Sequence, residues 1–403
     1  MRNLIAVFGL LLCTWFMLDA IVPNDLFSAS EMEKRAVISE TPEKGTLQNT
    51  QPETMQQETD SIGSIAVTEM AGNVSYYYNS LNPQEKELYG QIYTSIITRE
   101  NGILETVNDD VVDKVYQCVM NDHPEVFYSS AYRVEKQLMG GEVVRMTFTP
   151  NYHMTEEEVT LYKGQIEDYV NRCMQGLAPG ADEYDKVKYV YEYVIENTEY
   201  VRDCPNNQNI CSVFLNGQSV CQGYAKATQY LLSRMGVEAT LAYGKVGNEF
   251  HSWNLVRVDG EYYYMDPTWG DAGYVRPGSN AAEGTPHAVN YEYFLITTKQ
   301  ISKSHVIDNV VPLPACVSAR NNYYVREGLY LQMYDEATVK SIFDRGENNA
   351  DGFVTFMCSD EVVYTQAKDE LITNQRVFDY LGKAQSVSYT CNDDLYTLIF
   401  WIE

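Results

Sequence analysis

The sequence predicts an α+β protein in which helices and antiparallel strands occupy separate stretches of the chain. Apolar residues from Tyr224 to Met235 recur at helical spacing, and Gly236 is placed to end that helix. Two strand-like runs farther on flank Asp259-Gly260, the strongest short-range signal for a β-hairpin. A helix followed by a separate antiparallel hairpin is typical of α+β folds. The 403 residues leave room for two or three domains.

Residues 1–27 predict an export signal or a single N-terminal membrane anchor. Arg2 is a minimal basic start, and an apolar run follows from Leu4 to Leu18. The length of this run lies on the border between a cleaved signal and an uncleaved anchor. In either case we expect the bulk of the chain outside the membrane, extracellular or at the cell surface.

Residues 28–72 predict a disordered stalk. They are rich in Glu, Gln, Thr and Ser and nearly lack aromatic residues. Such a composition cannot bury enough apolar surface to offset the entropy lost on folding.

For residues 73–180 the sequence predicts an N-terminal α+β region and does not indicate its function. A helix starts at Asn82-Pro83-Gln84-Glu85, which combines an N-cap residue with a proline in the first turn. The other expected elements are a helix over Val111–Met120, strands over Val126–Tyr132 and Val143–Thr149, and a helix over Thr155–Cys173.

Residues 181–310 predict the catalytic core, which begins with a helix over Tyr184–Asn197. Ser219 and Gln222 have the spacing of a capping box, so Cys221 is expected in the first turn of the next helix. Unpaired N–H groups and the positive end of the helix dipole favour negative charge there. A thiol at this place ionises more readily, and the thiolate is the nucleophile.

The hairpin brings a histidine and an aspartate together. A two-residue turn at Asp259-Gly260 pairs Val258 with Glu261, so Asp266 falls opposite Trp253. His251 lies two residues from Trp253 on the same face, because side chains alternate faces along a strand. His251 and Asp266 are therefore predicted to be diagonal neighbours, with Cβ atoms within about 8 Å.

Cys221, His251 and Asp266 predict a catalytic triad for acyl transfer. Cys221 would attack an amide carbonyl, His251 would accept and return the proton, and Asp266 would orient the imidazole. The backbone N–H of Cys221 is the expected first donor of an oxyanion hole. The second donor stays open: Gln218 and Gln222 are candidates, although a structural role is favoured for each.

The segments CQGYA, HSWNLV and YYYMDPTWGD resemble the transglutaminase-like superfamily, a papain-related group of thiol enzymes, and most of all its bacterial surface proteins. The resemblance implies a papain-like or transglutaminase-like core over about residues 181–310. It carries the catalytic roles over to Cys221, His251 and Asp266 and to no other residue.

Other chemistries find little support in the sequence. No CxxC pair, HExxH, P-loop, EF-hand loop or GxGxxG after a strand is present. The five histidines (His123, His153, His251, His287 and His305) are scattered along the chain, so we expect no metal and no cofactor. The net charge of −27 argues against binding to nucleic acid or to anionic lipid.

Two features of the core leave alternatives open. Cys204 and Cys211 could form a disulfide that ties down the loop before Cys221, but the cysteine count does not decide this. The Gly- and Pro-rich segment between Asp271 and Asn290 could be a lid over the site or a plain surface loop.

Residues 311–403 predict a small C-terminal α+β domain. No catalytic motif is present, so a binding or packing module is expected. Its elements are a strand near Tyr323, a helix over Glu336–Phe343, a strand over Gly352–Cys358, a helix over Thr365–Ile372 and paired strands over Ser386–Cys391 and Leu395–Ile402.

Together these features predict an exported or anchored thiol enzyme that acts on amide bonds of a protein or peptide, such as a cell-envelope peptide. Hydrolysis, as a peptidase or deamidase, is slightly favoured because water is always present. A protein cross-linking transamidase is the first alternative. A surface binding or structural protein without turnover on the same scaffold is the alternative of a different class.

Overall fold

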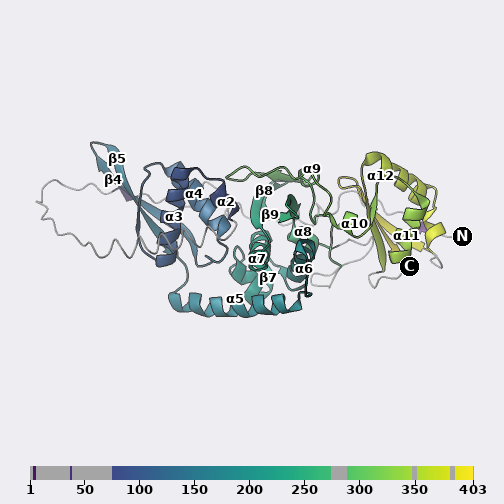
Figure 1. The fold of residues 1–403 in the computed structure, drawn as a ribbon, viewed down its shortest axis with the longest axis horizontal. Helices are drawn as coiled ribbons and strands as arrows, with labels where there is room; N and C mark the ends of the chain where they lie inside the picture. The colour runs from purple at the N-terminus through teal and green to yellow at the C-terminus, as the bar shows by residue number, and fades with distance from the viewer. Residues whose placement is uncertain are drawn as a thin grey trace, which may run out of the picture.

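The computed structural model describes residues 3–5, 37–38, 75–273, 288–346, 352–381 and 386–402. The predicted α+β class is confirmed: helices surround three sheets of four or five strands, arranged one after another along the long axis of the molecule (Figure 1). The described residues also form one small parallel sheet of two short strands. Nearly all of the predicted signal or anchor and of the predicted stalk lie outside the described residues, as does most of the Gly- and Pro-rich segment. Among the helices that are described, none has the length and apolar character to cross a bilayer.

The N-terminal region is a four-stranded sheet with helices beside it, in the strand order β2-β4-β5-β3. The predicted helix start at Asn82 is confirmed, because Asn82 and Glu85 form a reciprocal capping box. The β4–β5 hairpin is longer than predicted and turns at Gly140-Gly141, where both residues have positive φ. The elements are α2 (Tyr76–Asn79), α3 (Pro83–Thr98), β3 (Gly102–Leu104), α4 (Asp109–Asp122), β4 (Ser129–Met139), β5 (Glu142–Tyr152) and α5 (Glu156–Gly176), with β2 (Val37–Ile38) at the edge.

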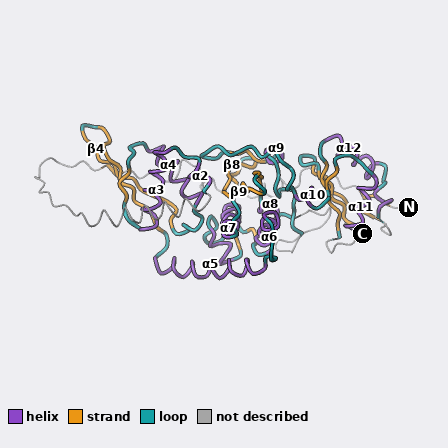
Figure 2. The backbone as a smooth tube through the Cα atoms, in the orientation of Figure 1, coloured by secondary structure: helices purple, strands orange, loops and turns teal. Residues whose placement is uncertain are grey.

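The middle of the molecule holds an antiparallel sheet in the order β10-β9-β8-β11, with helices α6 and α7 on one side (Figures 1 and 2). Helix α7 packs on β8 and β9, and it is buried on nearly all sides from Gly223 to Leu232. The elements are α6 (Glu183–Glu196), β6 (Glu199–Tyr200), the π-helix η1 (Ser212–Asn216), β7 (Gln218–Ser219), α7 (Cys221–Arg234), β8 (Ala239–Val246), β9 (Glu249–Val258), β10 (Glu261–Met265), α8 (Pro267–Asp271), α9 (Thr298–Ile301) and β11 (His305–Ile307).

Helix α7 ends as predicted but starts differently. Gly236 follows the last turn with a φ of +74°, which a glycine adopts without strain. The predicted capping box is wrong: Val220 is the N-cap, and no side chain caps the helix. Ser219 instead belongs to β7, and its hydroxyl bonds the Ser212 hydroxyl at 2.6 Å. The Ser219 hydroxyl, which the local sequence pattern assigned to the helix cap, thus bonds Ser212 instead.

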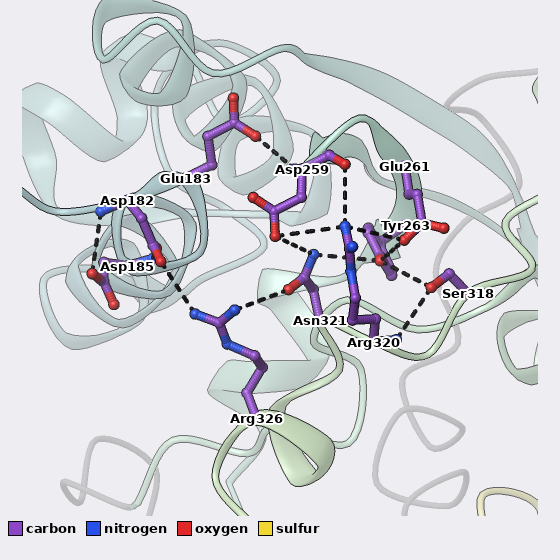
Figure 3. A network of polar contacts seen from close by, with 10 residues as sticks. All are labelled: Asp182, Glu183, Asp185, Asp259, Glu261, Tyr263, Ser318, Arg320, Asn321 and Arg326. Atoms are coloured by element: carbon purple, nitrogen blue, oxygen red, sulfur yellow. Dashed lines mark hydrogen bonds and ion pairs between the residues drawn. The ribbon is translucent and has the colours of Figure 1, made fainter.

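The β9–β10 hairpin has the predicted register. Val258 pairs with Glu261 and Asn254 pairs with Met265, so Asp266 follows in line. Asp259 and Gly260 both have positive φ, as a type I′ turn requires. Polar contacts from distant segments hold this turn (Figure 3): the Asp259 N–H donates to Glu183 Oε2 at 2.6 Å, and Asn321 Nδ2 donates to Asp259 Oδ2 at 3.1 Å.

The C-terminal region is a five-stranded sheet in the order β1-β14-β15-β13-β12, packed against helices. The strand expected near Tyr323 is wrong: Asn322 caps a short helix there, and the Tyr323 ring stacks on Tyr291 with centroids 3.7 Å apart. The helix expected from Thr365 starts one turn earlier, because Asp360 caps it. The elements are β1 (Asn3–Ile5), α10 (Tyr323–Arg326), β12 (Tyr330–Leu331), α11 (Glu336–Gly346), β13 (Phe353–Cys358), α12 (Glu361–Lys368), the π-helix η2 (Asp369–Thr373), α13 (Val377–Tyr380), β14 (Ser386–Asn392) and β15 (Thr397–Ile402).

The buried apolar residues form clusters that extend over more than one of the folded regions. One cluster of buried residues runs from Tyr77 to Val311 and so joins the N-terminal region to the middle sheet. A second cluster lies within the C-terminal region, between Leu331 and Phe400. The predicted domain boundaries stay predictions.

Candidate active site

Cys221 is the first residue of α7 and is partly exposed. Of the cysteines that the structure describes, only Cys221 and Cys391 are not buried. Because no side chain caps α7, the first N–H groups of the helix are left to an anion beside them. Cys221 therefore lies at the helix start, as predicted, although without the predicted capping box.

Cys204 and Cys211 are both free thiols in the structure. The Cys204 thiol lies 3.4 Å from the Gln218 carbonyl, and Cys211 is fully buried. The loop before Cys221 is therefore held without a disulfide between them, by contacts such as the Ser212–Ser219 hydroxyl pair.

His251 and Asp266 meet as the hairpin register predicts. His251 Nε2 lies 2.7 Å from Asp266 Oδ2, and both side chains are buried. The other carboxylate oxygen caps α8, accepting the N–H groups of Thr268 at 2.9 Å and Trp269 at 3.2 Å. A single buried carboxylate thus both starts a helix and holds the imidazole.

The charges around His251 favour its protonated form. Burial alone would lower the pKa of His251, but the Asp266 carboxylate and the Cys221 thiolate, which both hydrogen-bond the ring, raise it to about 10. Since Nε2 faces Asp266, Nδ1 is the nitrogen left for Cys221. Burial would raise the pKa of Asp266, yet His251 and His305 bring it well below its ordinary value.

His305 is a site residue that sequence reasoning missed. Its Nε2 lies 3.1 Å from Asp266 Oδ2, the oxygen that also binds His251. The view that the histidines are merely scattered is therefore wrong, because His251 and His305 converge on one carboxylate. Strand β11 carries His305 and pairs with β8, a pairing that no turn motif announces. The glycine Gly244 on β8 is a weak signal: a Cβ there would lie 1.9 Å from the Val306 carbonyl, so β11 approaches very closely.

His251, Asp266 and His305 are also the described residues that could hold a metal ion, with donor atoms within 4.8 Å of one another. The contacts that Asp266 makes with the two histidines are at hydrogen-bond distances. A metal would have to displace the proton that His251 holds up to about pH 10. The donor set therefore fits a hydrogen-bonded relay better than a metal centre.

Tyr200 is a second residue that the sequence did not indicate. Strand β6 pairs with β7 in parallel, which places Tyr200 beside Ser219, two residues before Cys221. Burial raises the pKa of Tyr200, and the charges of Cys221 and Asp266 raise it further, so its hydroxyl stays protonated near the thiol. Gln218, one of the two glutamines considered for the oxyanion hole, instead donates to Glu199 at 3.1 Å.

The site therefore combines a thiol at a helix start, a buried imidazole and a buried carboxylate, the side chains that thiol acyl-transfer enzymes use. Residues 130–267, about a third of the chain, match the family model of the transglutaminase-like superfamily. This region is thus similar to the transglutaminase-like superfamily, as the resemblance predicted, and the match supports a thiol enzyme in general terms. It starts earlier and ends earlier than the expected core, and it includes Cys221, His251 and Asp266 but not His305.

Solved structures give weaker likenesses. A structure described as a TGase is 16% identical and aligns over 38% of this chain and 47% of its own, with a TM-score of 0.25. A proposed cysteine protease from Cytophaga hutchinsonii is 12% identical over 34% of this chain and 62% of its own, with a TM-score of 0.24. The chain thus spans less than two thirds of either structure, and TM-scores this low support neither a fold nor an activity. Comparison with curated proteins finds no match.

The raised pKa of His251 predicts that this imidazole keeps its proton through neutral pH and loses it near pH 10. Its proton then stabilises the fold at and below the ordinary pKa of histidine, and this contribution is lost as the pH rises through about 10. NMR titration of the imidazole signals measures this directly. His153 is the control, because partial burial of its ring lowers its pKa. Titration of His251 at or below the value for His153 would contradict the ion pair.

Proposed function

We propose that this chain is a thiol enzyme that cleaves amide bonds of proteins or peptides through an acyl-enzyme on Cys221. His251 is its acid and base, Asp266 orients His251, and hydrolysis is favoured over transfer to an amine. We also propose that the enzyme acts outside the membrane, on a substrate such as a cell-envelope peptide. The observation that carries the activity is the continuous contact from Cys221 through His251 to Asp266.

Acylation starts from the Cys221 thiolate and the His251 imidazolium of the free enzyme. The Cys221 thiolate adds to the amide carbonyl carbon, and the carbonyl oxygen becomes an oxyanion. The C–N bond then breaks as the His251 imidazolium gives its Nδ1 proton to the leaving nitrogen. The products of this half are an amine and a thioester on Cys221. Asp266 stays ionised throughout and keeps the imidazole in its plane.

Deacylation reverses these roles. Neutral His251 takes a proton from water, whose oxygen attacks the thioester carbon, and the Cys221 thiolate leaves. A carboxylic acid is released, and the thiolate–imidazolium pair forms again. A primary amine in place of water would give a new amide, which is the cross-linking alternative. The net charge of −27 disfavours polyanionic substrates at any step.

The test first measures the reactivity of the cysteine thiols and then identifies the reaction product. The full-length chain is treated with iodoacetamide, and labelling of each cysteine is timed by mass spectrometry in the wild type and in His251→Gln. Cys391 is the internal control, since it is the other described cysteine that is not buried. Cys221 should label faster than Cys391 and should lose this advantage in His251→Gln. Equal rates in the wild type would end the proposal of a thiol enzyme.

The second stage separates the reactions. A glutaminyl peptide is added with and without a primary amine. Cleaved peptide bonds or free ammonia with glutamate indicate hydrolysis, whereas a peptide–amine conjugate indicates transamidation and overturns the preference for water. A reactive Cys221 that forms no thioester with amide or activated acyl compounds would support the binding-protein alternative.

Tyr200 is proposed as the second oxyanion-hole donor, because its protonated hydroxyl lies within electrostatic reach of Cys221. Tyr200→Phe should lower kcat by about 10²-fold, the usual cost of one such donor, with little change in KM. Alkylation of Cys221 should keep its rate, since alkylation forms no oxyanion. Tyr162→Phe on α5 is the matched control. Unchanged kcat in Tyr200→Phe would remove Tyr200 from the mechanism.

A further inference from the structure

We propose that His305 is a positioning residue of this site: as a neutral hydrogen-bond donor, it holds the Asp266 carboxylate in line with His251. The inference rests on the proposed function of Cys221 and His251. It assigns a role to a buried polar side chain that hydrogen-bonds Asp266 and lies beyond the matched part of the chain.

The contacts of Asp266 show what His305 adds. Oδ1 is held by the backbone N–H groups of Thr268 and Trp269, and Oδ2 is shared by His251 at 2.7 Å and His305 at 3.1 Å. Without His305, only His251 would hold Oδ2. Rotation of the carboxylate about the cap would then carry Oδ2 away from His251. Two donors on Oδ2 therefore oppose this rotation more strongly than one donor does.

The hydrogen-bond partners of His305 favour the tautomer that this role needs. Ser304 Oγ lies 2.8 Å from Nδ1 of His305, and the Tyr293 hydroxyl lies 3.2 Å from Ser304 Oγ. When Ser304 donates to Nδ1, the ring proton resides on Nε2 and points at Asp266. The Ile301 carbonyl also acts on the ring and favours the opposite placement, so the tautomer is a direct test of the inference.

The surroundings of His305 keep it uncharged. Trp253, Trp269 and Tyr293 enclose the ring with centroids 4.9, 4.9 and 5.6 Å away. Burial lowers the pKa of His305; the Asp266 carboxylate opposes this, and the positive charge of His251 reinforces it, with a net lowering.

Neutrality matters because a charged His305 would compete with His251 for the one negative charge of Asp266. The thiolate–imidazolium pair would then lose part of its counter-ion. A neutral donor orients the carboxylate and leaves its charge to His251. The aromatic enclosure thus serves the reactivity of Cys221 as well as the packing of β11.

Three variants of the full-length chain test the role. His305→Leu removes the donor, His305→Gln keeps an N–H at similar reach, and His153→Gln is the control at an exposed histidine. We expect kcat to fall about tenfold in His305→Leu, with KM unchanged within about twofold, and to recover most of this loss in His305→Gln. The alkaline limit of kcat/KM should move downward in His305→Leu, because an Asp266 carboxylate that rotates away from His251 holds the imidazolium proton less strongly.

A measurement independent of turnover completes the test. In the ¹⁵N-labelled wild type, the imidazole signals of His305 should report a neutral ring with the proton on Nε2 at neutral pH. A proton on Nδ1, or an imidazolium, would overturn the inference. If His305→Leu does not fold, Ser304→Ala replaces it, and that variant should shift the tautomer and lower kcat in the same direction.

The outcomes separate this inference from the proposed function. A wild-type Cys221 that alkylates no faster than Cys391 ends the proposed function itself. A reactive Cys221 with the same kcat and the same pH profile in His305→Leu ends only the role of His305. Equal loss in His305→Leu and His305→Gln, with no shift of the alkaline limit, would mean that His305 is packing alone.

Discussion

Replacing Cys221 by alanine is expected to abolish the acyl-enzyme and to lower turnover by about 10⁴-fold or more, the scale seen when a covalent nucleophile is removed. No other described thiol lies at a helix start beside an ionised imidazole. The fold should be retained, because the Cys221 side chain is partly exposed. Intact-protein mass spectrometry after mixing with an activated acyl ester measures the covalent adduct, and circular dichroism checks the fold.

Cys391→Ala is the matched control for this variant. Cys391 lies on β14, is also partly exposed, and has no histidine contact in the described part of the chain. We expect full adduct formation and full turnover in this control. An adduct that persists in Cys221→Ala, or one that disappears in Cys391→Ala, would place the nucleophile elsewhere.

Replacing Asp266 by asparagine is expected to lower turnover by about 10³- to 10⁴-fold, because an amide presents the wrong partner to the His251 ring. The pKa of His251 should fall from about 10 toward its ordinary value, since the charge that raises it is gone. Kinetics of an activated acyl ester and NMR titration of His251 measure the two effects.

The same variant should lose about 3 kcal/mol of stability at neutral pH, because a buried charged imidazole is left without its partner. The lowered pKa of Asp266 contributes stability above the ordinary pKa of aspartate, and the raised pKa of His251 contributes it until the pH passes about 10. The difference between wild type and variant should therefore shrink above about pH 10. Denaturant unfolding across pH measures this.

Asp360→Asn is the control for stability, because Asp360 caps α12 as Asp266 caps α8 but contacts no imidazole. Asparagine is itself a good N-cap, so this control should change stability by less than about 1 kcal/mol. A loss in Asp266→Asn no larger than that in Asp360→Asn would show that Asp266 acts only as a helix cap.

Local signals predicted the parts of the site that neighbouring residues determine. Asp259-Gly260 requires positive φ at both positions, so the turn and its register followed from two residues. The register then brought His251 and Asp266 together, because side chains alternate along a strand. Cys221 at a helix start followed from the apolar spacing of α7, which survives the wrong assignment of its cap.

Long-range contacts decided what local signals could not. Ser219 does not cap α7, because it pairs with Tyr200 of β6 and its hydroxyl bonds Ser212 of η1. Tyr323 does not lie in a strand, and its ring stacks on Tyr291. His305 reached Asp266 through a pairing between β11 and β8 that joins segments far apart in the chain.

By itself, then, the sequence determined the class of fold, the hairpin, the place of Cys221 at a helix start and the contact between His251 and Asp266. Periodicity, turn conformation and strand alternation act over a few residues, so local signals are enough for these features. Only the tertiary structure decided that Asp266 has a second imidazole partner in His305 and that Tyr200 pairs with Ser219, two residues before Cys221. Those contacts depend on which strands pair across long connections. Such pairing is set by the burial of the whole sheet and leaves no short motif in the sequence.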